Sequence, residues 1–165
     1  MINLLEDVHK ALEARAFYLA LTGALVLPDI CGSMEHADGA ANRRRYASWF
    51  DEWIGPRYEA FLSGKQCYEF RCDLLHQATT GSNRRTYKKI LFLVPGATTH
   101  TMHKNLFMGA LNLDLNAFCG DMTSGAHRWL QAKSETQPVK GHLSCLIQTH
   151  PQGIAPYIVG LPVIG

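Results

Sequence analysis

Apolar side chains recur at helical spacing between residues 3 and 133, and this periodicity constrains the fold more than any other feature. Asn3 and Glu6 occupy the capping-box positions of a first helix. We expect this helix to run from about residue 3 to about residue 26, where Leu27-Pro28 ends it. Residues 29–41 are rich in Gly, Ser and Asp, a composition typical of a loop.

A second predicted helix begins at Asn42, a residue suited to helix capping, and ends before Gly55-Pro56. Its aromatic residues lie three or four apart and form one stripe: Tyr46, Trp49, Phe50 and Trp53. Such a stripe indicates a core or a dimer interface rather than a ligand box. A short helical piece over residues 57–62 and a third helix over about 66–77 follow.

The pattern changes after residue 77. A turn-forming run at 78–83 precedes a predicted strand at 88–94, for which residues 106–111 offer a hairpin partner. A fourth helix begins at Asn112 or Asp114, and the region after Lys133 contains several prolines and glycines, with a candidate strand at 143–148.

We therefore expect a mainly α fold. It comprises a bundle of about four helices over residues 1–133, a small β-hairpin at about 88–111 inserted before the last helix, and an irregular tail at 134–165. We expect the tail to pack on the same domain or wrap around it.

The composition is that of one globular domain, with 165 residues, 47% hydrophobic and 18% charged. The longest apolar stretches fall short of the roughly 20 residues that a spanning helix needs. Acidic residues stand near the N-terminus where an export signal carries Lys or Arg, and five scattered cysteines form no disulfide framework. We expect a cytoplasmic protein without a membrane partner. No Gly-rich phosphate loop occurs, which argues against the common nucleotide-hydrolysing enzymes.

The strongest chemical signal is the pair Arg71 and His76 at the end of the third predicted helix. A guanidinium grips a phosphate through two donors, and an imidazole moves protons near neutral pH. Five helical steps separate the two side chains by about 140°. A joint site therefore requires the helix to loosen at His76, Arg71 to reach around it, or a second copy of the helix to contribute.

This Arg-x4-His pattern at the end of a helix resembles the HEPN superfamily, whose active members carry Arg, four to six residues, and then His. The resemblance implies a homodimeric four-helix domain that cleaves RNA without a metal or other cofactor, as in toxin and defence systems. In these systems a cognate antitoxin is a further candidate partner. Many members place a polar residue after the Arg, where this chain has Cys72. The strings at 27–32 and 45–51 also resemble those of uncharacterised bacterial proteins.

By the same resemblance, Arg71 stabilises the phosphate and His76 is the acid/base. Side chains on the same helix would position them: Tyr68, Glu69, Asp73 and Gln77. Two basic clusters are candidates for holding the RNA backbone: Arg43, Arg44 and Arg45, and Arg84 and Arg85. Solvated surface is the alternative interpretation of these clusters.

Three other interpretations of the sequence compete with this one. Arg71 and His76 can be structural in a non-catalytic helical module that dimerises or binds a partner. A zinc site can draw on His100 and His103 with cysteines such as Cys67, although no Cys-x2-Cys spacing occurs. Cys72 stands one helical turn before His76, as a nucleophilic pair requires, but no oxyanion-hole signature accompanies it.

Overall fold

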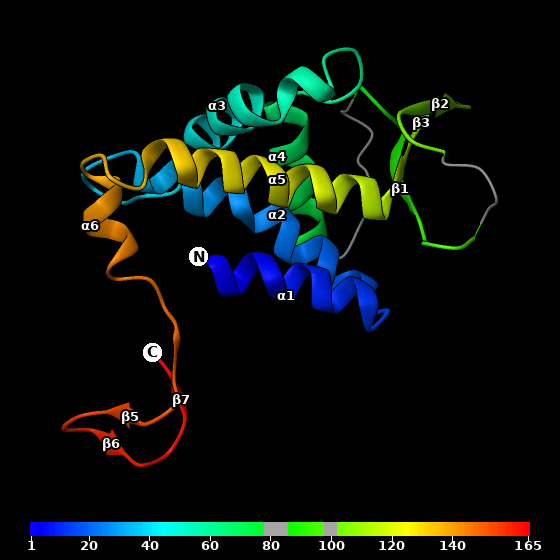
Figure 1. The fold of residues 1–165 in the computed structure, drawn as a ribbon. Coiled ribbons are helices and arrows are strands. Elements are labelled where there is room, and N and C mark those ends of the chain that lie inside the picture. The colour runs from blue at the N-terminus through cyan, green and yellow to red at the C-terminus, as the bar shows by residue number, and fades with distance from the viewer. Residues whose placement is uncertain (78–85, 98–101) are drawn as a thin grey trace.

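The computed structural model describes residues 1–77, 86–97 and 102–165, and it confirms a mainly helical fold with a small sheet before α5 (Figure 1). The helices are α1 (Ile2–Glu13), α2 (Phe17–Met34), α3 (Arg43–Trp53), α4 (Gly64–Gln77), α5 (Leu115–Lys133) and α6 (Val139–Leu143), with a 3-10 turn η1 (Gly55–Arg57). In place of the helical piece expected at 57–62, η1 is followed by turns.

Helix α2 is the centre of the bundle. It packs against α1, α3, α4, α5 and α6. By length and composition, α2 is the one helix in the described part of the chain that is apolar enough to cross a membrane, but 56% of it is buried inside the protein. Its central position accounts for its apolar composition.

The prediction of one helix from residue 3 to residue 26 is wrong in two places. The chain breaks at 14–16, where Arg15 adopts φ 59°, and α1 begins without a side-chain cap. Helix α2 then continues through Pro28 to Met34, so residues 29–34 are helical rather than a loop. Propensity favoured a stop at Pro28, but burial on several sides holds the helix together beyond it.

A side chain of α3 is hydrogen-bonded to α2 close to its proline. A proline inside a helix removes one backbone hydrogen bond and disturbs the preceding turn. In this protein the hydroxyl of Tyr46 donates to the carbonyl of Leu25, one turn before Pro28, at 3.1 Å. The carbonyl that lacks a donor because of Pro28 is that of Ala24, four residues earlier, so the tyrosine does not replace the missing bond but joins α3 to α2 beside the proline.

Helices α3 and α4 follow the sequence predictions closely. Asn42 caps α3 by accepting from the Arg45 amide at 3.1 Å, and the aromatic stripe of α3 lies in the core. Helix α4 begins with a capping box in which Ser63 and Gln66 accept reciprocally from each other's amides, at 3.3 and 2.8 Å. Gly64 lies against the backbone of Ala47, which brings the two helices into close contact.

The small sheet differs from the predicted hairpin. Its strands are β1 (Lys89–Leu93), β2 (Asn105–Phe107) and β3 (Ala110–Asp114), in the order β1-β3-β2. β1 pairs with β3 in parallel, so residues 88–94 and 106–111 are not hairpin partners, and the hairpin is β2–β3. The parallel register places Ile90 beside Leu111, and both side chains are buried against the bundle. The need to bury these apolar side chains on one face of the sheet favours the parallel pairing of β1 with β3.

Asp114 ends β3 and caps α5, where its side chain accepts from the Ala117 amide at 2.8 Å. After α5 the tail contains the short α6 in place of an irregular start, and the strand expected at 143–148 is absent. The strands that follow are two residues long: β4 (Thr149–His150), β5 (Gly153–Ile154), β6 (Ile158–Val159) and β7 (Val163–Ile164). β4 pairs with β7, and β5 pairs with β6.

Two glycines give a matched test of this packing. A Cβ at Gly64 would lie 2.3 Å from the Ala47 carbonyl oxygen, whereas a Cβ at Gly120, inside α5, would meet nothing within 4 Å. We expect Gly64→Ala to lower the free energy of unfolding by about 1–3 kcal/mol, because two helix backbones must separate. Gly120→Ala should raise it by about 0.5–1 kcal/mol. Urea unfolding followed by circular dichroism measures both, and equal effects would contradict the close α3–α4 contact.

Candidate functional site

Arg71 is directed from α4 toward the central helix α2. Its Nη2 lies 2.7 Å from Oδ2 of Asp29, and only 20% and 10% of the two side chains are exposed. The Nε of Arg71 is buried and makes no hydrogen bond within the described residues. The structure therefore adds to the motif an acidic partner that the sequence had suggested was in a loop.

Burial and the guanidinium act on Asp29 in opposite directions. Burial raises the pKa of the Asp29 carboxyl, and the nearby charge of Arg71 lowers it, with burial the larger effect. The pair is thus a partly desolvated charge pair in which each ion depends on the other. A guanidinium has five N–H donors, so Arg71 retains donors for a phosphate while it holds Asp29.

His76 is exposed in the last turn of α4. Because α4 remains helical through Gln77, the helix does not loosen at His76. The separation of about 140° from Arg71 therefore holds. Of the three arrangements considered from the sequence, a second copy of the helix requires the least change in this structure.

The four proposed positioning residues have different surroundings. Tyr68 packs edge-on against Tyr46 with 5.2 Å between ring centroids, and Glu69 forms an ion pair with Arg43 at 3.4 Å. Asp73 is buried and Gln77 is the last residue of α4. Tyr68 and Glu69 thus contact α3, the helix that carries one basic cluster.

The basic residues of α3 point in different directions. Arg43 lies beside α4 through its ion pair with Glu69. Arg45 forms a salt bridge with Asp38 at 2.5 Å, which lowers the pKa of that carboxyl to about 2. Within the described residues, no hydrogen bond or ion pair involves the guanidinium of Arg44. Arg84 and Arg85 lie outside the described residues.

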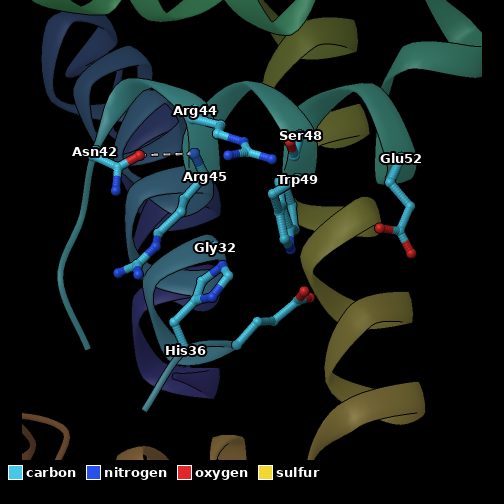
Figure 2. A pocket seen from close by; sticks show the side chains of 9 residues that line it. Gly32, His36, Asn42, Arg44, Arg45, Ser48, Trp49 and Glu52 are labelled. Atoms are coloured by element: carbon cyan, nitrogen blue, oxygen red, sulfur yellow. Dashed lines mark hydrogen bonds between the residues drawn. The ribbon is translucent and has the colours of Figure 1, made fainter. Parts of the chain in front are cut away.

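Arg44 and Arg45 line a pocket of about 480 Å³ between α3 and the C-terminal turn of α2 (Figure 2). Figure 2 shows the His36 ring between Arg45 and Trp49, with the Arg44 side chain extending toward Ser48. The lining also includes Glu35, which accepts a hydrogen bond from the indole of Trp129 at 2.6 Å. Because charges of both signs surround it, the pocket is not a simple anion site.

The structure does not assemble the zinc ligands considered from the sequence. Within the described residues, no three His, Cys, Asp or Glu side chains gather as a metal site, and His100 lies outside those residues. Burial raises the pKa of the Cys67 and Cys119 thiols to about 12, which favours protonated thiols. Cys72 is half-buried beside Arg71 in the middle of α4.

His103 instead belongs to a polar network that the sequence did not reveal. Its Nδ1 accepts from the Asp114 amide at 3.2 Å, and its Nε2 lies 3.2 Å from the hydroxyl of Tyr58. That hydroxyl donates to Asp121 at 2.9 Å, and Arg57 also pairs with Asp121. Burial lowers the pKa of His103, which favours the neutral imidazole. The network connects η1, α5 and the end of β3, and its contacts are those of a structural clamp.

The ion pair between Asp29 and Arg71 generates a prediction about pH. Arg71→Ala leaves a buried carboxylate without its partner, and we expect a loss of about 2–4 kcal/mol in the free energy of unfolding at neutral pH. An acid with a raised folded pKa binds protons more readily in the folded state, so its penalty is fully present above that pKa. The deficit should therefore shrink as the pH falls through the raised pKa of Asp29.

Denaturant unfolding between pH 4 and 8 measures this effect. The double variant Arg71→Ala/Asp29→Asn supplies the control, because it has no carboxylate to protonate. It should recover part of the stability at neutral pH and lose the pH dependence. A deficit that is the same at every pH would show that Asp29 does not depend on Arg71.

Comparison of the chain with protein-family models, with curated proteins and with solved structures finds no match. The HEPN resemblance thus depends on the motif at Arg71 and His76 and on its helical setting.

Proposed function

We propose that the chain is a HEPN-like, metal-independent endoribonuclease of the toxin or defence type that acts as a cytoplasmic homodimer. The observation that carries the proposal is the disposition of the motif on α4. Arg71 is half-buried and oriented by Asp29, while His76 is exposed one turn later. A fixed cation and an exposed imidazole, brought together from two copies of the helix, suit phosphodiester cleavage.

The chemistry assigns one role to each side chain. His76 accepts the proton of an RNA 2′-hydroxyl, whose oxygen attacks the adjacent phosphorus. The bond from phosphorus to the 5′-oxygen breaks, and the imidazolium returns a proton to that oxygen. The products carry a 2′,3′-cyclic phosphate and a 5′-hydroxyl. Arg71 stabilises the negative charge that develops on the phosphoryl oxygens.

Two copies are needed because the side chains diverge on one helix. With α4 helical through Gln77, Arg71 of one copy meets His76 of the other when the two helices face each other across a two-fold axis. A closed dimer of this kind contains two such sites. Arg43 and Glu69 lie on the same side of the bundle and would flank each site.

The competing proposal is a non-catalytic binding module. The ion pair between Arg71 and Asp29 supports it, because a structural arginine would have the same contact. The aromatic face of α3 is not available to a partner, since Tyr46, Trp49 and Phe50 are at most 2% exposed. A binding module would therefore use another surface, and the experiment below distinguishes the two proposals.

We expect the wild type to cleave single-stranded RNA in EDTA and to leave 2′,3′-cyclic phosphate ends. His76→Ala should abolish cleavage, because it removes the proposed acid/base. Arg71→Lys keeps a cation beside Asp29 but loses the planar fork that grips a phosphate, so cleavage should fall at least tenfold while the fold is kept. His127→Ala, which removes another exposed helical histidine, is the matched control.

Mixing His76→Ala with Arg71→Lys tests the two-copy arrangement. Half of the exchanged dimers contain one copy of each variant, and one of their two sites has both wild-type side chains. Activity should return to about a quarter of wild type. Failure of both wild type and mixture to cut RNA, with folded protein, would favour the binding module.

Arg44 and Arg45 provide a matched pair for RNA binding. Arg45 is neutralised by Asp38, whereas the guanidinium of Arg44 is exposed without such a partner among the described residues. Arg44→Ala should weaken RNA binding across sequences and reduce the slope of log K against log salt by about 1. Arg45→Ala should leave that slope unchanged. Fluorescence anisotropy over a salt series measures both, and equal slopes would remove Arg44 from the RNA surface.

A further inference from the structure

The hairpin β2–β3 exposes consecutive large apolar side chains at its turn. Leu106, Phe107 and Met108 are 53%, 65% and 81% exposed. Figure 1 shows the small sheet at the end of the bundle away from α6, and β2 is an edge strand of that sheet. Single exposed apolar side chains are common on soluble proteins, but three in succession at one turn indicate a contact site.

The turn of the hairpin carries a methionine where its backbone favours another residue. Met108 and Gly109 connect β2 to β3 with φ values of 49° and 82°. Two positive φ values in a two-residue connection are typical of a type I′ turn, in which Asn or Gly suits the first position. A methionine is strained there, and its exposed side chain adds nothing to the core. The hairpin by itself therefore gives no reason for a methionine at this position, whereas contact with an apolar partner does.

Contacts at the base of the hairpin hold the turn in a fixed position. His103 precedes β2 and is held by the Asp114 amide and the Tyr58 hydroxyl. The Nζ of Lys104 donates to the Arg57 carbonyl at 3.1 Å and lies 5.5 Å from the centroid of the Tyr58 ring. A surface that is held in this way loses little conformational entropy when it binds. The polar network around His103 thus positions the apolar turn for contact.

The surroundings of the turn are cationic. Between Asp73 and Asp114 the chain has no Asp or Glu. The Lys88 amide donates to the Gly109 carbonyl at 2.9 Å, and Lys89 begins β1 next to the start of β3. Both lysines are exposed, and neither has an acidic partner within the described residues. Residues 106–108 with these two lysines form a surface that we call the hairpin tip, with an apolar centre and a cationic rim.

We propose that the hairpin tip docks on a membrane surface that contains anionic phospholipid. The apolar side chains of residues 106–108 enter the boundary between headgroups and acyl chains, and the ammonium groups of Lys88 and Lys89 contact lipid phosphates. The cytoplasmic leaflet carries such a negative surface, so the docking agrees with a cytoplasmic protein. Our expectation of no membrane partner concerned spanning helices and export signals, and a surface contact requires neither.

The composition of the hairpin tip favours a lipid surface over a nucleic acid. Both partners attract lysines, but unpaired bases stack on aromatic rings or guanidinium planes. Leu106 and Met108 offer no such plane, and Met108 is the most exposed of the three apolar side chains. The boundary of the acyl chains accepts all three. The docking does not depend on the proposed ribonuclease activity, because the hairpin tip lies outside α4.

Sedimentation of the full chain with lipid vesicles tests the docking. The wild type should bind vesicles of phosphatidylglycerol and phosphatidylcholine in equal parts, and should not bind vesicles of phosphatidylcholine alone. Met108→Asn should weaken binding about tenfold or more, because it removes an inserted apolar side chain. Its Tm should stay unchanged or rise, because Asn suits the left-handed φ. Met108→Leu keeps the apolar side chain and should bind like the wild type.

Two further variants locate the contact. Lys88→Gln/Lys89→Gln should weaken vesicle binding about tenfold or more and reduce its salt dependence. Val159→Asn is the matched control, because it removes an apolar side chain that is 72% exposed outside the hairpin tip, and it should bind like the wild type. A folded wild type that does not sediment with the mixed vesicles overturns the docking. Binding that survives both Met108→Asn and the lysine changes also overturns it.

RNA binding and cleavage in EDTA, measured on the same proteins, separate the docking from the proposed function. Vesicle binding without cleavage would keep the docking and remove the ribonuclease, and cleavage without vesicle binding would do the reverse. If the wild type does not bind vesicles and the Met108 and lysine variants bind RNA more weakly than the wild type, the hairpin tip is an RNA surface and the docking is wrong.

Discussion

The course of α2 through Pro28 is the constraint on which the rest of the structure depends. Because the helix continues to Met34, it is long enough to contact α1, α3, α4, α5 and α6. The hydroxyl of Tyr46 donates to a carbonyl in the turn before the proline, which joins α3 to α2 at this point. Had the helix ended at Leu27, Asp29 would lie in a loop and α4 would have no charged partner in the bundle centre.

Through Asp29, helix α2 gives Arg71 both a structural contact and a fixed position. A buried carboxylate next to the guanidinium stabilises the fold and also fixes where the cation can act. The ion pair between Arg71 and Asp29 is compatible with a binding module and with an enzyme. The geometry within one chain therefore supports both proposals. His76 distinguishes the two proposals, because its imidazole is exposed and has no evident role in packing.

Local signals in the sequence predicted the parts of the fold that depend on local chemistry. The cap at Asn42 is confirmed, Asp114 is the one of the two candidate caps that begins α5, and the boundaries of α3 and β1 agree with the prediction within about one residue. The predictions were wrong where contacts between residues far apart in the sequence determine the structure. Examples are the continuation of α2 through Pro28 and the parallel pairing of β1 with β3. For the candidate site, the sequence spacing suggests Arg71 and His76, but the contacts of Arg71 depend on helix packing. Asp29 was missed because a helix through a proline cannot be recognised from propensity alone.

The close approach of Gly64 to Ala47 has a consequence for recognising relatives of this chain. A homologue that keeps the same seam between α3 and α4 has no room for a side chain at that position. Arg and His at a spacing of five often arise by chance. Their occurrence together with a glycine equivalent to Gly64, a Pro-Asp pair equivalent to Pro28-Asp29 and a tyrosine equivalent to Tyr46 is much less common by chance. That combination is a structural signature by which distant homologues can be separated from chance occurrences of the motif.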